Sequence, residues 1–230
     1  MSEVIEELSA VVEQEWARIK RGQFFTTQAV RFDRRVYLET MLQIFHYTKN
    51  NAINQAAAAY AAHHTQFGLL KFALRHAQEE LGHERMIIRD LVGIGMSEEA
   101  ILASKALPAT DALNGYLMSV ALKDGLIPRL GYSFWAEDAY DHIQPILASA
   151  RKTFDLTDAR MSFFVAHSSI DEKHSKEVRD AIRTWVRTEA DATAIKRVAR
   201  TTLYLTGQIL ETAYEHAKSF SDDKRTAHAV

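Results

Sequence analysis

The sequence predicts an all-α fold, a compact bundle of about seven helices, from two observations. Only 3 prolines and 9 glycines occur in 230 residues, so few positions interrupt a helix. Apolar residues recur at spacings of three and four along most of the chain, and no stretch of useful length alternates apolar and polar residues as a strand does. Because no repeat or linker divides the chain, we expect residues 1–220 to form one helical domain and residues 221–230 a polar C-terminal tail.

Capping and breaking residues set the expected helix boundaries. Gly93 and Gly95 end one helix, and Ser97, followed by two glutamates, is typical of the start of the next. Pro128 fits the first turn of a later helix, and Asp158 could cap the helix after that. In chain order, we expect helices over residues 4–21, 27–64 and 67–92, two more that start near residues 97 and 108, and three over residues 125–150, 158–185 and 191–220.

Net charge and composition exclude several classes of protein. The formal net charge is -2, so nothing in the composition attracts a polyanion, and we expect no nucleic-acid binding. The chain has no cysteine, which excludes disulfides, thiolate-bound zinc, iron–sulfur clusters and a cysteine nucleophile. No run of about 18 apolar residues is present, so we expect no membrane span. Residues 1–14 are acidic and unlike a secretory signal, which favours a cytoplasmic protein.

The predicted helix over residues 158–185 carries the strongest candidate site residues. His167, Asp171 and His174 stand at positions i, i+4 and i+7, so their side chains span about 60° of arc and can converge on one point. Their neighbours are mostly apolar, and two histidines with an aspartate are costly in such surroundings unless they bind something. The three residues indicate a metal site or, alternatively, a buried His–Asp–His hydrogen-bond network.

Two earlier segments offer matching ligands. Glu80 and His83 form the Glu-x-x-His unit that carboxylate-bridged iron proteins project into a helix bundle. Glu79 competes with Glu80, which we prefer because it shares a stripe with His76 and His83. Glu137 lies among aromatic residues, where a lone carboxylate is costly without a partner. Imidazole and carboxylate together favour iron or manganese over calcium or magnesium.

Other polar residues are weaker candidates for the site. Asp138, Asp141 and His142 follow Glu137 closely and are alternatives to it. Five further histidines have no carboxylate at metal-ligand spacing, so we expect surface or satisfied core residues at His46, His63, His64, His216 and His228.

These motifs, in this order and spacing, resemble those of the haem-oxygenase-like diiron oxidases and oxygenases, an iron-containing redox enzyme family. The strings EELGHE at residues 79–84 and FHYT at residues 45–48 are also similar to members of that family. The resemblance spans residues 30–215 and implies a compact haem-oxygenase-like bundle. It implies six iron ligands: Glu80, His83, Glu137, His167, Asp171 and His174. It further implies that Glu137 bridges the two irons and that Glu80, Glu137 and Asp171 take part in catalysis.

The resemblance also implies an activity. Two Fe(II) ions per chain, or Mn in their place, would use O2 as co-substrate to oxidise a small carboxylate-bearing molecule, a fatty acid or an amino acid, by C–C cleavage, desaturation or decarboxylation. A homodimer and an external electron donor are expected. Lys49, Arg75 and Lys123 could anchor the substrate carboxylate, although each could equally be a surface cation.

Three alternative functions stay open. The first is N-oxygenation of an amine or amino acid, but relatives of that kind add a carboxylate in a stretch that here offers only Asn51, Asn54 and Gln55. The second is a metal-free helical binding protein on the same fold, in which the polar residues form a buried network. The third is a haem-binding protein, although six polar residues would crowd a haem slot.

Overall fold

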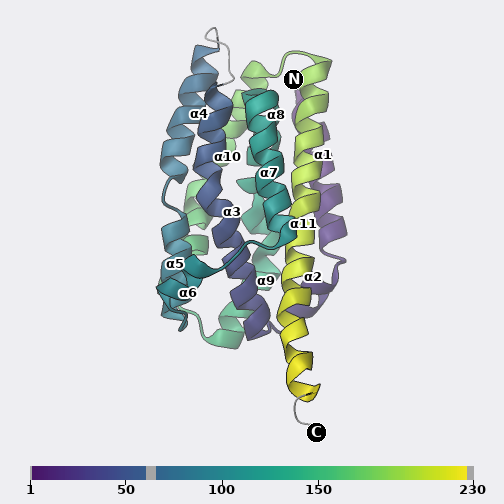
Figure 1. Cartoon of the computed structure of the whole chain (residues 1–230). Helices are drawn as coiled ribbons and strands as arrows, with labels where there is room; N and C mark the ends of the chain where they lie inside the picture. Colours follow the sequence, from purple (N-terminus) through teal and green to yellow (C-terminus); the bar gives the residue numbers. More distant parts are fainter. Residues whose placement is uncertain (1, 61–65, 227–230) are drawn as a thin grey trace.

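The computed structural model describes residues 2–60 and 66–226; the side chains of residues 2, 169–172 and 220–226 lie outside the described part, as do His63, His64 and His228. Within these ranges the chain forms eleven α-helices, one 3₁₀ helix and no strand, which confirms the all-α prediction (Figure 1). The elements are α1 (Ser2–Ile19), α2 (Gln23–Gln28), α3 (Arg34–Tyr60), α4 (Phe67–Glu80), α5 (Glu84–Gly93), α6 (Glu98–Ala103), α7 (Pro108–Lys123), α8 (Leu126–Ala136), α9 (Ala139–Phe154), η1 (Asp158–Arg160), α10 (Ser162–Trp185) and α11 (Glu189–Thr226).

The helices pack around two long elements, α3 and α11. Helix α3 contacts α4, α7 and α11, and α11 contacts α1, α7 and α8. Figure 1 shows α11 running beside α1 and extending beyond the other helices toward the C-terminus. Gly131 lets α8 approach α11 closely, because a Cβ atom there would lie 2.2 Å from the carbonyl oxygen of Ile195.

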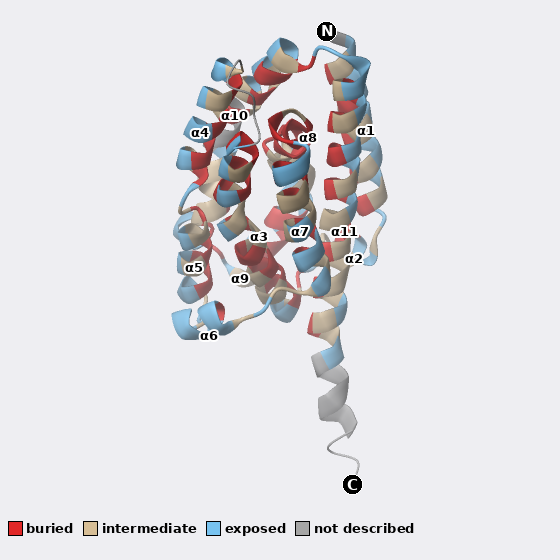
Figure 2. Cartoon of the chain, turned by 45° about the horizontal axis from the view of Figure 1, so that its top comes forward, coloured by how far each residue is buried: buried red, intermediate tan, exposed pale blue. Residues whose placement is uncertain are grey.

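Buried residues lie on the inward faces of the helices (Figure 2). On α1, for example, Ile5, Leu8, Val12 and Trp16 are buried at helical spacing. Helix α3 differs because polar residues such as Gln43, Asn54 and Gln55 are buried along it as well. Within the described ranges, none of the helices combines the length and the apolar character that crossing a membrane requires.

The eleven α-helices exceed the eight predicted ranges because α2 forms at residues 23–28, where we expected mostly a break, and because two predicted helices are interrupted. A break at residues 29–33 separates α2 from α3, so the helix predicted from residue 27 begins only at Arg34; in the break, Gln28 accepts a hydrogen bond from the backbone of Asp33 at 2.8 Å. The predicted helix over residues 67–92 is broken at residues 81–83, where Gly82 has a φ of 98°. The predicted helix over residues 125–150 is broken at residues 137–138.

Two of these breaks occur at candidate site residues. Glu80 is the last residue of α4, His83 immediately precedes α5, and Glu137 immediately follows α8. A close helix approach at Gly82 would be the usual reason for a glycine between two ligands, but nothing lies within 4 Å of the position of a Cβ there. Gly82 therefore serves the turn that redirects the chain between Glu80 and His83.

Helix α10 begins at a cap that comes from another helix. Both carboxylate oxygens of Asp90, on α5, accept hydrogen bonds: Oδ1 from the backbone of Ser162 at 2.9 Å and Oδ2 from that of Phe163 at 3.0 Å. The sequence predicted Asp158 as this cap, but Asp158 lies in η1 and pairs with Arg151 at 2.7 Å. The position of α10 against α5 is therefore set by a buried carboxylate far away in the sequence.

Candidate metal centre

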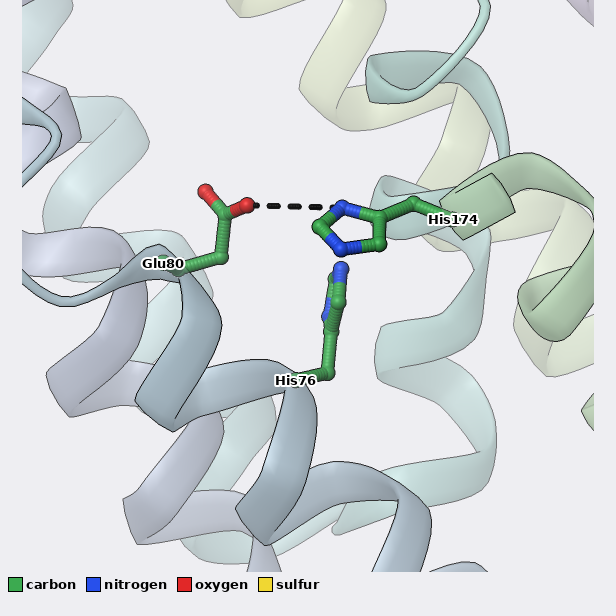
Figure 3. A group of neighbouring side chains, drawn as sticks. All are labelled: His76, Glu80 and His174. Atoms are coloured by element: carbon green, nitrogen blue, oxygen red, sulfur yellow. Dashed lines mark ion pairs between the residues drawn. The ribbon is translucent and has the colours of Figure 1, made fainter. Parts of the chain in front are cut away.

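One group of potential ligands joins α4 to α10. One ligand atom from each of His76, Glu80 and His174 lies within 4.8 Å of the others, and all three residues are buried. Figure 3 shows the three side chains pointing toward one another, with the Glu80 carboxylate facing the His174 imidazole. The distance from Glu80 Oε1 to His174 Nδ1 is 3.6 Å.

A second group uses the same glutamate. Ligand atoms of Glu80, His83 and His167 also lie within 4.8 Å of one another. Glu80 Oε2 is 3.3 Å from His83 Nδ1, and the rings of His83 and His167 are 4.8 Å apart. Glu80 thus belongs to both groups, and each of its two oxygens faces a different group.

Glu137 lies on one side of this arrangement. Its Oε1 is 3.3 Å from His76 Nε2 and its Oε2 is 3.4 Å from His174 Nδ1, so both oxygens face the first group. The resemblance had implied that Glu137 is the bridging carboxylate. The geometry instead favours Glu80, which lies between the groups.

Glu79, the alternative to Glu80 as a ligand, lies at the solvent-exposed edge of the first group, next to His174. Its side chain is 32% exposed; Oε2 accepts a hydrogen bond from His174 Nε2 at 2.9 Å, and Oε1 accepts one from Lys173 at 3.0 Å. Glu79 therefore orients His174 from outside the group and leaves Nδ1 directed inward. Asp171 is on α10 between the two candidate histidines, but its side chain lies outside the described residues.

The alternatives to Glu137 are directed elsewhere. Asp138 forms an ion pair with Arg179 of α10. His142 stacks on Trp16, with 4.8 Å between the ring centroids, and Asp141 is exposed. The structure therefore brings five of the six predicted ligands together, with the sixth undescribed, and gives the alternatives other roles.

The sequence did not single out His76 as a ligand, although a signal was present. His76, Glu80 and His83 have the spacing i, i+4, i+7, the same as the later triplet on α10. Two triplets of identical spacing, each with a central carboxylate, form a stronger pattern than the Glu-x-x-His pair alone.

Two buried imidazole nitrogens of the candidate centre are without hydrogen-bond partners among the described residues, which favours a bound cation. They are His76 Nε2 and His83 Nδ1. Each is 3.3 Å from a carboxylate oxygen, of Glu137 and Glu80 respectively, but the geometry does not suit a hydrogen bond. An unpaired buried imidazole nitrogen is costly, and a metal ion among these carboxylates would supply its partner. The residues present therefore fit a metal ion that takes nitrogen and oxygen ligands.

The other ring nitrogens of two candidate ligands are held by neighbours. The side-chain amide of Gln55 contacts His76 Nδ1 at 2.8 Å, and the carbonyl of Phe163 accepts a hydrogen bond from His167 Nδ1 at 2.6 Å. Such contacts fix the ring orientation and leave the second nitrogen for a metal.

The buried carboxylates and imidazoles of this site shift one another's pKa values. Burial would raise the pKa of the Glu137 carboxyl, but the imidazoles of His174 and His76 outweigh it and lower that pKa to about 2. Burial would lower the pKa of His174, but the neighbouring carboxylates, Glu137 first among them, outweigh it and raise that pKa to about 9. Buried negative charge therefore attracts a cation here, either a proton on His174 or a metal ion.

A cavity of about 180 Å³ reaches the ligand groups from inside the bundle. Glu80, Glu137 and His167 line one end, and aromatic and aliphatic side chains form most of the remaining wall. One face of α3 borders it from Tyr37 to Asn51, a rise of about 21 Å along the helix. The described lining residues include no lysine or arginine.

The three cations suggested as carboxylate anchors do not line this cavity. Lys49 donates to His46 at 3.1 Å, Arg75 pairs with Glu177 at 2.7 Å, and Lys123 is an exposed residue in the last turn of α7. A substrate carboxylate in the cavity would thus have to interact with the metal centre itself or with neutral groups.

Comparisons with solved structures show the fold. A domain of unknown function with a haem-oxygenase-like fold from Shewanella denitrificans OS217 is 35% identical, with a TM-score of 0.91 and 94% of each chain covered. A TenA homologue from P. horikoshii OT3 is 16% identical, with a TM-score of 0.75 over 92% of this chain and 98% of the other. A CADD-like protein of unknown function from Nostoc punctiforme PCC 73102 is 12% identical, with a TM-score of 0.72 over 93% and 98%.

The sequence itself matches a family. No curated protein matches the chain significantly. The family model described as "Iron-containing redox enzyme" matches residues 39–207, which include every candidate ligand named above. With this match and its haem-oxygenase-like fold, the chain belongs to the iron-containing redox enzyme family.

Proposed function

We propose that this chain is a diiron oxidase or oxygenase that uses O2 to oxidise a small organic substrate held in the apolar cavity. The observation that carries the proposal is the pair of ligand groups that share Glu80 at the end of that cavity. Family membership supports iron and redox chemistry; two Fe(II) ions per chain and the use of O2 are the further step.

The protein's residues hold the metal ions and control access to them. Two Fe(II) ions bound by carboxylate and imidazole ligands would supply the electrons that activate O2. His76, His174 and Glu137 would hold one ion, His83 and His167 the other, and Glu80 both. The aromatic and aliphatic wall excludes water from the reacting end of the substrate.

The cavity favours a substrate with an extended apolar part. Its only ionisable carboxyl and imidazole lining groups, within the described residues, are Glu80, Glu137 and His167, all at the metal end. A carboxylate-bearing substrate such as a fatty acid would place its head group there and its chain along α3. C–C cleavage, desaturation or decarboxylation would then occur close to the head group.

The alternative of N-oxygenation receives less support. The stretch of α3 where related N-oxygenases add a carboxylate faces the centre with neutral amides: Asn51 donates to Glu80 at 3.1 Å and Gln55 contacts His76. An amine substrate would find no additional acid in this stretch, residues 50–60 of α3.

Anaerobic titration of the purified protein with Fe(II) tests the proposal. Binding should saturate near two irons per chain, and Mn(II) should raise the melting temperature, because a ligand that binds only the folded state stabilises it. Saturation at zero, with no thermal shift, would overturn the proposal in favour of a metal-free binding protein.

A cavity-filling variant tests the substrate part separately. Ile44→Trp adds bulk on the α3 wall, about two helical turns from Asn51, the α3 residue that contacts Glu80. It should keep two metal ions but lose turnover in a mass-spectrometric screen of fatty acids under O2 with Fe(II) and a chemical reductant. Unchanged turnover of the wild-type substrate would place the substrate elsewhere.

A further inference from the structure

Arg129 is a buried cation whose hydrogen-bond partners are all neutral. It lies on α8 and is 2% exposed. Nε donates to Asn54 Oδ1 at 2.6 Å, Nη1 to Ser133 Oγ at 2.8 Å, and Nη2 to Asn51 Oδ1 at 2.8 Å and to the Asn51 carbonyl at 3.5 Å. No ion pair between Arg129 and a carboxylate occurs within the described part of the chain. Burying an unpaired charge is costly, so the position calls for a functional reason.

Asn51 connects this cation to the candidate metal centre. An arginine can only donate hydrogen bonds, so the Asn51 oxygen must face Arg129 and the Asn51 nitrogen must face away from it. That nitrogen, Nδ2, donates to Glu80 Oε2 at 3.1 Å. The orientation of the Asn51 amide is therefore determined by its two neighbours. In the resulting hydrogen-bond chain Arg129 donates to Asn51, and Asn51 donates to Glu80.

The hydrogen bond from Asn51 acts on one particular oxygen of Glu80. Oε2 is the oxygen that faces His83, whereas Oε1 faces His174. Holding Oε2 in place fixes the rotation of the whole carboxylate, because its two oxygens share one plane. Without this hydrogen bond, Glu80 could rotate so that both oxygens face a single group.

We infer that Arg129 is a positioning residue for the metal centre, acting through Asn51 to keep each Glu80 oxygen directed at a different ion. The inference rests on the proposed function, since it concerns the carboxylate shared by the two ligand groups. Arg129 touches neither group directly. Its buried positive charge also lies close enough to Glu80 and Glu137 for their charges to act on it: burial lowers the Arg129 pKa to about 10, against the opposing effect of Tyr132 and these carboxylates.

Three variants test the inference by Mn(II) binding and electron paramagnetic resonance, without any assay of turnover. Asn51→Leu removes the amide at similar volume, and Arg129→Met removes the cation. Ser133→Ala is the matched control, because it deletes another hydrogen bond of Arg129 and leaves the one to Asn51 intact. Thermal unfolding of each chelator-treated variant reports whether it folds; if Arg129→Met does not, Asn51→Leu decides.

The wild type and Ser133→Ala should bind two Mn(II) ions that show the signal of a coupled pair. In Asn51→Leu and Arg129→Met, the second ion should bind about 10- to 100-fold more weakly, the effect typical of losing a group that orients a ligand, and the coupled signal should disappear. Two coupled ions of unchanged affinity in folded Asn51→Leu would overturn the inference, as would two uncoupled ions in the wild type. A wild type that binds no metal would overturn the proposed function itself, which is a distinguishable result.

Discussion

His46 and His174 are both buried histidines, 3% and 2% exposed, yet their surroundings shift the pKa values of the two imidazoles in opposite directions. Burial alone would lower the pKa of either imidazole. At His46 the charge of Lys49 adds to burial, and the pKa falls to about 4. At His174 the nearby carboxylates outweigh burial, and the pKa rises to about 9.

The contacts of the two residues explain the difference. His46 is a satisfied core histidine, one of the two alternatives that the sequence left open: Lys49 donates to Nδ1 at 3.1 Å, and Nε2 lies 2.9 Å from the hydroxyl of Ser104. Around His174, oxygens of Glu79, Glu137 and Glu80 lie at 2.9, 3.4 and 3.6 Å. Several carboxylates gathered around one buried histidine, rather than a buried histidine by itself, therefore distinguish the candidate metal centre from the surroundings of His46.

The largest effect is expected from Glu80→Gln, which keeps the shape of the side chain and removes its charge. Because Glu80 belongs to both ligand groups, affinity for both ions should fall by more than about 100-fold, since even groups that merely orient ligands are worth 10- to 100-fold. Mn(II) titration by calorimetry measures this. His46→Gln is the control and should still bind two ions; two tightly held ions in Glu80→Gln would show that the shared carboxylate is misassigned.

His76→Gln should remove one ion and spare the other. His76 belongs only to the group with Glu80 and His174, whereas the second group keeps Glu80, His83 and His167. Glu137→Gln should behave in the same way, because both Glu137 oxygens face the first group. Metal analysis after gel filtration should give about one ion per chain for each variant. Loss of both ions from Glu137→Gln alone would restore Glu137 as the bridge.

A pH series on chelator-treated protein should separate the two histidines. His46 has its folded pKa near 4, below the ordinary 6.5, so the stability that depends on neutral His46 is full above pH 6.5 and is lost as the pH falls toward 4. His174 has its folded pKa near 9, so its contribution is full below pH 6.5 and is lost as the pH rises through 9.

Melting temperatures of two variants across this range check the assignment. His46→Gln should flatten only the acid side of the stability profile, and His174→Gln only the alkaline side, each by a few degrees. If the melting temperatures of His174→Gln and the wild type fall equally at alkaline pH, the carboxylates do not raise the pKa of His174 as described.

The smallest effect is expected from Glu79→Gln. Its amide oxygen can still accept the hydrogen bond from His174 Nε2, so the ring orientation should persist while a negative charge is lost at the exposed rim. Two ions should bind, with about tenfold lower affinity for one of them. Loss of an ion in titration would mean that Glu79, not Glu80, is a ligand.

The sequence predicted the helical class and most of the candidate centre for local reasons. Positions i, i+4 and i+7 of one continuous helix share a face wherever that helix packs, so the spacing of His167 and His174 was informative by itself. The same spacing placed His76 on one stripe with Glu80 and His83, but we used it only to prefer Glu80 over Glu79 and did not predict His76 as a ligand.

The remaining features depend on contacts between distant segments. Gly82 was a local signal for the turn at residues 81–83, although we predicted a continuous helix there. The break at residues 137–138 has no glycine or proline next to it, so no local signal revealed it. The cap of α10 comes from Asp90, and the amide that holds Glu80 comes from α3. Neither partner can be identified before the helices are placed relative to one another.

If Glu80 joins two metal ions, as we propose, anomalous X-ray scattering from crystals loaded with Fe(II) should locate one ion on each side of its carboxylate. We expect two iron peaks, one bounded by His76, His174 and Glu137 and the other by His83 and His167, with one Glu80 oxygen directed at each. A single peak, or two peaks of which only one contacts Glu80, would contradict this account.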